Sequence, residues 1–276
     1  MKTSPEGTAP STAAEARGYQ ALRSHLAVLK LTAAAEALPA VLDAARAEKL
    51  TATAALERLL SIEVEATEAR RLAGRLRFAC LPSPATLAEF DFDAQPGVDP
   101  RLIADLASCR YLETATNVLM IGPPGVGKTH LAVGLARQAA EVGYRTYVTT
   151  AADLTARCHR AAIEGRWATT MRFFAGPTLL VIDELGYLPL PAEGASALFQ
   201  VIAQRYGKTS TIVTTNRPIT SWGDILGDAI VAAALLDRLL HRSVVLDITG
   251  ESYRLRDHQA RTANLRKANS PRTSRA

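Results

Sequence analysis

Apolar residues recur in two different patterns along the chain, and the change of pattern divides it. Between residues 18 and 80 they recur at helical spacing; Tyr19, Leu22, Leu26 and Leu29, for example, fall on one helical face. Alanine is abundant in this segment, while glycine and β-branched residues are few, which favours helices. The pattern therefore predicts a small all-helical domain near the start of the chain.

From residue 117 onward, short apolar runs alternate with helical segments. Such runs are typical of strands that are buried on both faces. The expected strands cover residues 117–121, 144–149, 178–182, 211–215 and 244–248. The expected helices cover residues 131–139, 151–162, 195–206 and 229–240, with a further one near 100–109. Alternating strands and helices predict an α/β domain in which helices cover both faces of a parallel sheet.

Breaks in these patterns set the expected domain boundaries. Helix-breaking residues begin at Leu81–Pro84, and Phe90 and Phe92 follow in a segment that is typical of a connector. We expect the two aromatic rings to pack against the domain that follows. The expected organisation is a disordered tail at residues 1–17, the helical domain and connector at 18–95, the α/β domain at 96–260 and a basic, flexible tail at 261–276.

The composition fits a globular protein with a sizeable core. Of the 276 residues, 48% are hydrophobic, and no apolar run is long enough to span a bilayer. The first residues lack the apolar core of a signal peptide. Cys80, Cys109 and Cys158 are scattered and form no C-x-x-C pair, which indicates a reducing compartment and no metal site or disulfide framework. We expect a soluble, cytoplasmic protein with no membrane partner.

The net charge of +5 is compatible with a nucleic-acid partner but does not establish one, because solubility alone explains many basic surfaces. An arginine cluster in the third helical segment contains Arg70, Arg71, Arg75 and Arg77. These residues could form a solvated helix end, where cations suit the helix dipole. They could equally form a face that contacts DNA phosphates. The residues alone favour neither interpretation.

The most specific motif lies between the first strand and the helix after it. Residues Gly122–Thr129 read GPPGVGKT and fit the phosphate-loop pattern G-x-x-x-x-G-K-[ST], whose backbone N–H groups surround a phosphate at a helix N-terminus. Lys128 is expected to bridge the terminal phosphates, and the Thr129 hydroxyl to hold Mg²⁺. The predicted nucleotide contacts are Gly122, Pro123, Pro124, Gly125, Val126, Gly127, Lys128, Thr129 and the adjoining His130. A simple turn is the alternative, but the flanking strand and helix favour a nucleoside triphosphate site.

Two carboxylates follow the third expected strand. Asp183 ends the apolar run, where a carboxylate that orients the Mg²⁺ held by Thr129 belongs. Glu184 can polarise a water for attack on the γ-phosphate. The pair could instead start a turn, but its distance from the phosphate loop favours catalysis. Asn216, after the fourth strand, could position the same water or contact the γ-phosphate, although alone it would be typical of a turn.

The residues say less about which nucleotide base is bound and about the roles of two arginines. Arg217 and Pro218 follow Asn216, so the guanine-reading N-K-x-D pattern is absent and ATP is the better candidate. Arg238 and Arg254 come after most of the sheet. An arginine that reaches a γ-phosphate from a neighbouring subunit can raise hydrolysis about 10³-fold or more. Spacing alone, however, favours ordinary surface arginines.

Taken together, these motifs resemble the IstB family, the ATP-dependent helper proteins of a class of bacterial insertion sequences. That family is similar to the DnaC and DnaA branch of AAA+ ATPases. The resemblance covers about residues 18–258 and rests on five segments in order. These are Gly122–Leu131, Leu179–Leu188, Ile212–Pro218, Gly227–Leu239 and Ser252–Arg254. The first occurs in many ATPases, whereas the others in this order are specific.

The resemblance implies more than the residues do. It implies a P-loop AAA+ fold in which Asn216 is the first sensor, Arg238 an arginine finger acting in trans and Arg254 a second sensor at the nucleotide. It also implies that the helical domain helps in self-assembly and DNA engagement. The expected activity is ATP hydrolysis by homo-oligomers, formed through AAA+ interfaces on duplex DNA, that recruit a transposase and help to select its target.

Three other functions remain open at the level of sequence. A helicase loader would share the ATPase core but engage a helicase and single-stranded DNA; the short Ala- and Leu-rich helical domain favours the IstB type. A small-molecule kinase would need an acceptor site and a lid, and the Asp183–Glu184 pair favours hydrolysis instead. A nucleotide-switched DNA-binding protein would scarcely hydrolyse ATP.

Overall fold

The computed structural model describes residues 12–187, 192–253 and 255. Its contacts divide the chain into two compact units, one ending at Ala73 and the other beginning at Gly74. The connector therefore belongs to the second unit, and the boundary differs from the expected one near residue 95. The physical reason is that Phe90 is buried in the core of the second unit and Phe92 packs against it, as their hydrophobicity led us to expect.

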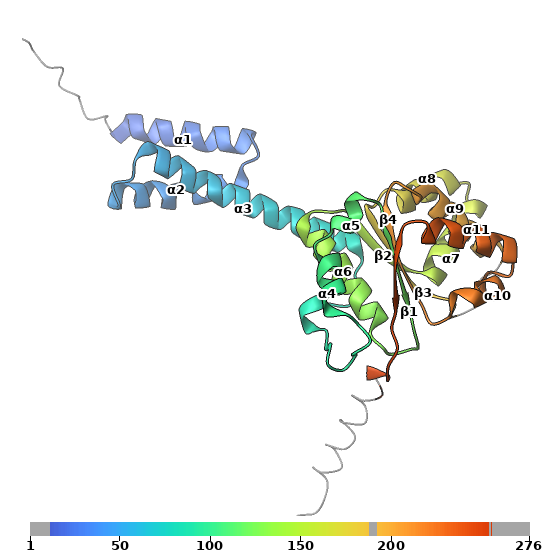
Figure 1. Ribbon diagram of the computed structural model, residues 1–276. Helices are drawn as coiled ribbons and strands as arrows, with labels where there is room; N and C mark the ends of the chain where they lie inside the picture. Colours follow the sequence, from blue (N-terminus) through green and yellow to red (C-terminus); the bar gives the residue numbers. More distant parts are fainter. Residues whose placement is uncertain (1–11, 188–191, 254, 256–276) are drawn as a thin grey trace, which may run out of the picture. The chain divides into compact units, whose positions relative to one another are not determined.

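The first unit consists of helices. They are α1 (Thr12–Val28), α2 (Thr32–Ala47) and α3 (Ala52–Ala79), whose last turns belong to the second unit (Figure 1). Leu26, Ala34, Leu38, Val41 and Leu59 form the buried core. The helical domain is thus confirmed, but α1 includes residues 12–17, which we had expected in a disordered tail. Alanine-rich sequence has high helix propensity, which accounts for the earlier start; residues 1–11 lie outside the described part.

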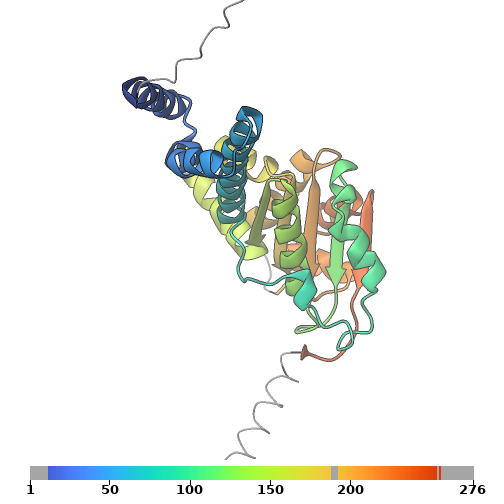
Figure 2. The ribbon, with the colours of Figure 1, turned by 90° about the vertical axis from the view of Figure 1, so that its left-hand side faces the viewer.

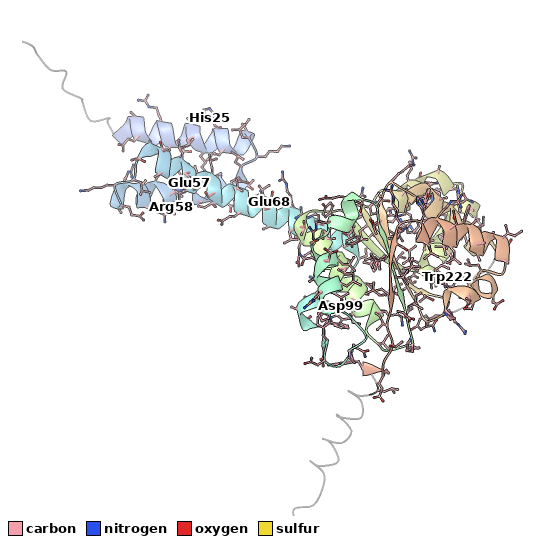
Figure 3. The ribbon with its side chains drawn as sticks, in the orientation of Figure 1. His25, Glu57, Arg58, Glu68, Asp99 and Trp222 are labelled. Carbon is pink, nitrogen blue, oxygen red and sulfur yellow. The ribbon has the colours of Figure 1, made fainter. Side chains whose placement is uncertain are left out.

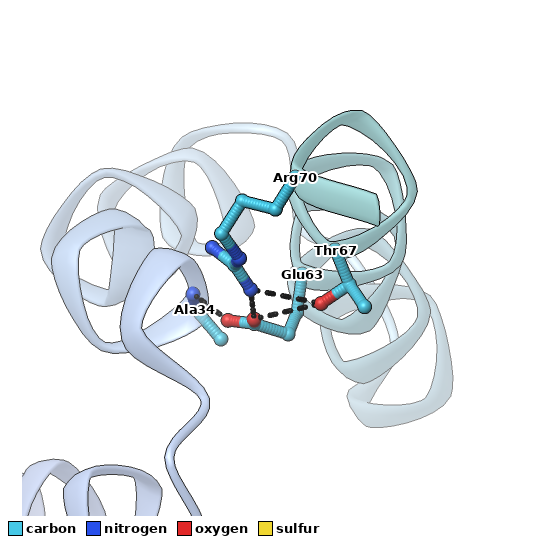
Figure 4. A network of polar contacts seen from close by, with 4 residues as sticks. All are labelled: Ala34, Glu63, Thr67 and Arg70. Carbon is cyan, nitrogen blue, oxygen red and sulfur yellow. Dashed lines mark hydrogen bonds and ion pairs between the residues drawn. The ribbon is translucent and has the colours of Figure 1, made fainter. Parts of the chain in front are cut away.

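A buried carboxylate joins two helices of this unit. Leu31 precedes α2 and cannot cap it with a side chain, so the N-terminal turn needs an acceptor from elsewhere. The Glu63 carboxylate of α3 supplies it, accepting from the Ala34 N–H at 2.9 Å (Figure 4). Arg70 donates to the same carboxylate at 2.7 Å and Thr67 at 3.3 Å. The Ala34 and Arg70 hydrogen bonds hold the pKa of Glu63 below its usual range.

The second unit is built on five parallel strands in the order β2-β3-β4-β1-β5. The strands are β1 (Asn117–Ile121), β2 (Thr146–Thr150), β3 (Leu179–Leu185), β4 (Ser210–Thr215) and β5 (Ser243–Asp247). The larger helices are α4 (Pro100–Ala107), α6 (Lys128–Val142), α7 (Ala151–Ile163), α8 (Trp167–Ala175), α9 (Ala192–Arg205) and α11 (Ala229–Leu240). Shorter ones are η1 (Leu87–Glu89), α5 (Arg110–Glu113), η2 (Ile219–Ser221) and α10 (Trp222–Leu226). The parallel α/β architecture is confirmed.

Helices cover both faces of this sheet (Figures 1 and 2). Along β1, Val118 and Met120 face one core, which α4, α6 and the connector complete. Leu119 faces the other, which α7 to α11 complete around the fully buried Trp222 (Figure 3). Alternate side chains of one strand thus enter different cores, as the pleat of a strand requires. The near-continuous apolar sequence of the strands thus correctly predicted a sheet that helices cover on both faces.

Helix α8 was absent from the expected elements. Its sequence, WATTMRFFA, is rich in aromatic and β-branched residues, which have only modest helix propensity. It is helical because Met171 and Phe174 are buried against the second core, so tertiary packing outweighs local preference. Among the described residues, no helix combines the length and the apolar character needed to cross a bilayer.

Candidate active site

The loop between β1 and α6 has positive φ angles at its glycines. Gly125 and Gly127 adopt φ of 85° and 93°, a region that residues with a side chain rarely occupy. A Cβ on Gly125 would lie 2.1 Å from Ser252 Oγ, and one on Gly127 would lie 2.6 Å from the Phe90 ring. The loop is therefore a closely packed structure between the connector and the segment after β5, and not an open turn.

Lys128 is the first residue of α6, and its side chain turns back into the loop. Its Nζ donates to the carbonyl oxygens of Gly122 and Pro123, at 2.8 and 2.7 Å. Only 5% of the residue is exposed. The ammonium is thus held inside the loop, at the N-terminus of α6, where N–H groups and the helix dipole favour anions. This is the arrangement expected for a phosphate-binding lysine.

Two hydroxyl groups surround the Asp183 carboxylate. Thr129 Oγ1, in the first turn of α6, lies 3.1 and 3.0 Å from its two oxygens. The hydroxyl of Thr214, on β4, donates to Asp183 Oδ1. Asp183 itself is buried. The structure thus brings together the two residues predicted to act on Mg²⁺, and adds Thr214, which the motifs had not indicated.

Glu184 has a different environment from its neighbour. Its φ is 61°, and the pairing of β3 with β4 is irregular between Ile182 and Leu185. The Glu184 N–H donates to Thr214 Oγ1 at 3.0 Å, and the residue is exposed. A bulge commonly redirects a side chain next to an active site, and a left-handed non-glycine residue costs conformational free energy. Glu184 therefore projects from the carboxyl edge of the sheet while Asp183 stays buried.

Asn216 directly follows β4 at this same edge. Its Oδ1 is buried, and among the described residues it has no hydrogen-bond partner. An unpaired buried acceptor is costly unless a ligand or a water satisfies it. Because that oxygen is shielded from solvent in this conformation, its lack of a partner favours neither an Asn216 that orients a water or contacts the γ-phosphate nor one that is a turn residue.

The remaining predicted residues differ in what surrounds them. Arg238 Nη1 donates to the Ala234 carbonyl at 2.8 Å, and its guanidinium lies over Phe199, 4.7 Å from the ring centre. Both contacts belong to α11 and α9, and within the described residues none joins Arg238 to the phosphate loop. Arg254 lies outside the described residues. The adjoining Tyr253 N–H donates to Gly125 O at 3.0 Å, so this segment reaches the loop.

His130 contacts the connector. Its Nε2 lies 2.8 Å from the carbonyl oxygen of Thr86, and its ring packs edge-on against Phe90. Together with the loop and the connector it lines a pocket of about 500 Å³. The other residues around the pocket come from the phosphate loop, from connector residues between Pro82 and Gln95, and from Tyr187 and Tyr253. The connector's part in this pocket was not predicted, because the connector carries no nucleotide-binding motif.

The arginine cluster of α3 is largely used within the chain. Arg70 pairs with Glu63, and Arg71 pairs with Glu68 at 2.6 Å. Arg75 Nε donates to the Ala140 carbonyl at 2.7 Å. Arg77 is exposed. Arg70, Arg71 and Arg77 nevertheless stay largely exposed, so these contacts decide neither for a solvated helix end nor for a DNA-binding face.

The donor set at Asp183 fits Mg²⁺. Among the described residues, no group of three or more His, Cys, Asp and Glu side chains is placed to hold a metal ion. Mg²⁺ in phosphoryl-transfer sites takes one or two protein ligands and completes its shell with phosphate oxygens and waters. The Thr129 hydroxyl and the Asp183 carboxylate, close to Lys128 in the first turn of α6, offer that kind of partial site.

Comparison with known proteins gives a consistent result. The family of IstB-like ATP-binding proteins matches residues 24–261 of this chain. The ATP-binding protein of insertion sequence IS5376 from Geobacillus stearothermophilus is 42% identical over 235 residues, which cover 85% of this chain and 92% of that protein. The corresponding protein of IS232 from Bacillus thuringiensis subsp. berliner is 38% identical over 240 residues, covering 87% and 96%.

A solved structure supports the fold. DnaA from Aquifex aeolicus, bound to AMPPCP, has a TM-score of 0.51 at 18% sequence identity, covering 68% of this chain and 57% of that one. At this identity the likeness concerns the fold alone. It supports the arrangement of the parallel sheet and of the helices around it.

Proposed function

Because the chain belongs to the family of IstB-like ATP-binding proteins, we propose that it hydrolyses the ATP that it binds. In this proposal it uses Mg²⁺, assembles on duplex DNA in the cytoplasm and assists a transposase in target selection and insertion. The observation that carries the Mg²⁺·ATP part is the Asp183 carboxylate, which accepts hydrogen bonds from Thr129 and Thr214 beside the phosphate loop. A protein that only binds Mg²⁺·ATP would use such a carboxylate too, so the support for turnover comes from the redirected, exposed Glu184 beside it.

Each residue has a defined part in the proposed reaction. Lys128 and the loop N–H groups bind the β- and γ-phosphates. Thr129 and Asp183 would hold Mg²⁺, which would neutralise charge at the phosphates when bound. Glu184 accepts a proton from the attacking water, and its exposed position at the edge of the sheet leaves room for that water. Asn216, which follows β4 at the same edge of the sheet, orients the same water through its side-chain amide.

The proposed assembly follows from the arginines. Arg238 lies in α11 with its guanidinium over Phe199, and we propose that it acts on the γ-phosphate bound by a neighbouring copy. Arg254 would contact the nucleotide of its own subunit from the segment that Tyr253 ties to Gly125. A head-to-tail interface of this kind generates rings or open helical assemblies. It makes hydrolysis depend on oligomerisation.

The proposed partners rest on the names of the relatives and on charge. The similar proteins from Geobacillus and Bacillus are named for insertion sequences, which supports a transposase as partner. The net charge of +5 suits contact with the DNA backbone. Since most of the α3 arginines have partners within the chain, we do not assign the DNA contact to them.

The experiment that tests this proposal is steady-state ATP hydrolysis with and without duplex DNA, together with sizing of the protein–DNA complex. We expect hydrolysis to be stimulated by duplex DNA, and large assemblies to form only when ATP is present. Hydrolysis that no DNA affects would contradict the assembly model. Stimulation by single strands alone would favour a helicase loader instead.

A further inference from the structure

One face of α6 receives the connector along its first three turns. Residues at positions 127, 130, 134 and 137 follow helical spacing, so they form a stripe that starts at the phosphate loop. The two glycines of the stripe admit apolar side chains: Phe90 lies against Gly127, and Leu87 lies against Gly134. A Cβ on Gly134 would be 2.7 Å from Leu87 Cδ2 and 3.1 Å from the Leu87 backbone nitrogen.

The two polar residues of the stripe bind the connector backbone. His130 Nε2 lies 2.8 Å from the carbonyl oxygen of Thr86, and Arg137 Nε donates to that of Ala85 at 3.2 Å. A carbonyl oxygen can only accept, so Nε2 of His130 carries the proton and donates it. The connector turn is itself closed by a capping box, since the Thr86 N–H and hydroxyl donate to Glu89. Residues 85–90 are thus fixed on α6.

The segment held in this way forms a wall of the nucleotide pocket. Ala85, Glu89, Phe90, Asp91 and Gln95 line it together with the phosphate loop. The loop is assigned to the phosphates, so the lining that the connector contributes is available to the nucleoside part of the ligand. The position of that wall depends on α6, to which His130 joins it one residue after Thr129.

We propose that His130 is a positioning residue that holds the connector as the wall of the pocket and thereby sets the affinity for the nucleoside part of ATP. The proposal rests on the ATP site described above. It assigns His130 no direct role in phosphate binding or in hydrolysis. Arg137, about two turns further along α6, has the same part through Ala85.

The test compares binding of Mg²⁺·ATP with binding of Mg²⁺·tripolyphosphate, which has the phosphates and no nucleoside. Calorimetric titration is applied to wild type, His130→Ala, His130→Gln, Arg137→Ala and the control His159→Ala, which changes an exposed histidine on α7. We expect His130→Ala to weaken ATP binding about fivefold to tenfold, the effect of one hydrogen bond, and to leave tripolyphosphate binding within about twofold. Glutamine, which can donate to the same carbonyl, should restore part of the loss. Arg137→Ala should act in the same direction.

A merely structural role would lower the affinity for both ligands together, and a thermal melt of each variant identifies a general loss of folding. The KM for ATP should rise in His130→Ala while kcat at saturation stays within about twofold. Equal losses for ATP and tripolyphosphate, or no loss for either, would overturn the positioning role. Failure of the wild type to bind ATP would overturn the proposed function as well, whereas normal wild-type binding with an unaffected His130→Ala overturns only this inference.

Discussion

The two units each bury a carboxylate, and the two carboxylates have different surroundings. Glu63 in the helical unit accepts hydrogen bonds from the Ala34 N–H and from Arg70, so a cation within the protein balances its charge (Figure 4). Asp183 in the second unit accepts from neutral hydroxyl groups, and among the described residues it forms no ion pair. Both side chains are at most 6% exposed, so burial alone does not separate them.

The difference indicates which carboxylate acts on a ligand. A buried charge is costly unless a partner balances it. Arg70 is that partner for Glu63, which therefore serves the structure by joining α2 to α3. Asp183 has no such partner among the described residues, and in our proposal a divalent cation that arrives with a nucleotide balances its charge. The following changes test this contrast in order of the size of effect that we expect.

We expect the largest effect, a loss of ATP turnover, from a change at Glu184, the exposed neighbour of Asp183. Glu184→Gln removes the proton acceptor and keeps the shape of the side chain, so ATP turnover should fall about 10²- to 10⁴-fold. Binding of ATP should remain, and protein–DNA assemblies should persist because ATP is no longer consumed. Steady-state turnover and sizing in the presence of duplex DNA measure the two effects. Equal turnover in wild type and variant would mean that Glu184 has no such role.

Asp183→Asn tests the carboxylate itself. The amide keeps an acceptor for the Thr214 hydroxyl but lacks the charge that holds Mg²⁺, so turnover should fall about 10²- to 10³-fold. A chelator that removes Mg²⁺ should abolish turnover in the wild type. Far-ultraviolet circular dichroism of the variant should match that of the wild type. A variant that loses its fold along with its activity would instead give Asp183 the kind of role that we assign to Glu63.

Glu63→Gln is the corresponding change in the helical unit. It removes the charge that Arg70 balances, and we expect amide protection in α2 to fall about tenfold while ATP turnover stays unchanged. Hydrogen exchange of the intact chain, followed by mass spectrometry, measures the protection. Glu68→Gln is the matched control, because the Glu68–Arg71 pair is exposed and such pairs contribute little. Equal protection in the Glu63 variant and wild type would remove Glu63 from the structural account.

The smallest expected effect is the pH dependence of the contribution that Glu63 makes to folding stability. The pKa of Glu63 is lowered in the folded chain, chiefly by the Ala34 N–H and then by Arg70. Its contribution to stability is therefore complete above the ordinary carboxyl pKa and is lost as the pH falls through the lowered value. The stability difference between wild type and Glu63→Gln should shrink as the pH falls below the ordinary carboxyl pKa. Urea midpoints of the helical signal at each pH measure it; a difference that grows in acid would contradict the sign.

The sequence predicted those parts of the site that one segment carries by itself. The phosphate loop and the pair Asp183–Glu184 are local motifs, and the structure brings Thr129 to Asp183 as expected. The strands were predicted because strands of a parallel sheet that are buried on both faces have nearly continuous apolar sequences. The roles of Arg238 and Arg254 stay predictions, the first because it concerns a second subunit and the second because Arg254 lies outside the described residues.

The sequence did not reveal the parts that depend on contacts between distant segments. Thr214 became a partner of Asp183 because β4 lies next to β3, and no local pattern specifies that strand order. The connector entered the pocket through Thr86 and His130, which are 44 residues apart. Helix α8 forms despite its modest helix propensity because its aromatic rings pack in the second core. In each case tertiary packing, and not the local sequence, determines the contact or the helix.

The most direct measurement of the central contrast is the Mg²⁺ dependence of ATP turnover in wild type, Asp183→Asn and Glu63→Gln. We predict that Glu63→Gln follows the wild-type curve and that Asp183→Asn loses turnover at every Mg²⁺ concentration or needs far more of the ion. The same curve for wild type and Asp183→Asn would contradict the assignment of Asp183 to the metal and, with it, the distinction between the two carboxylates.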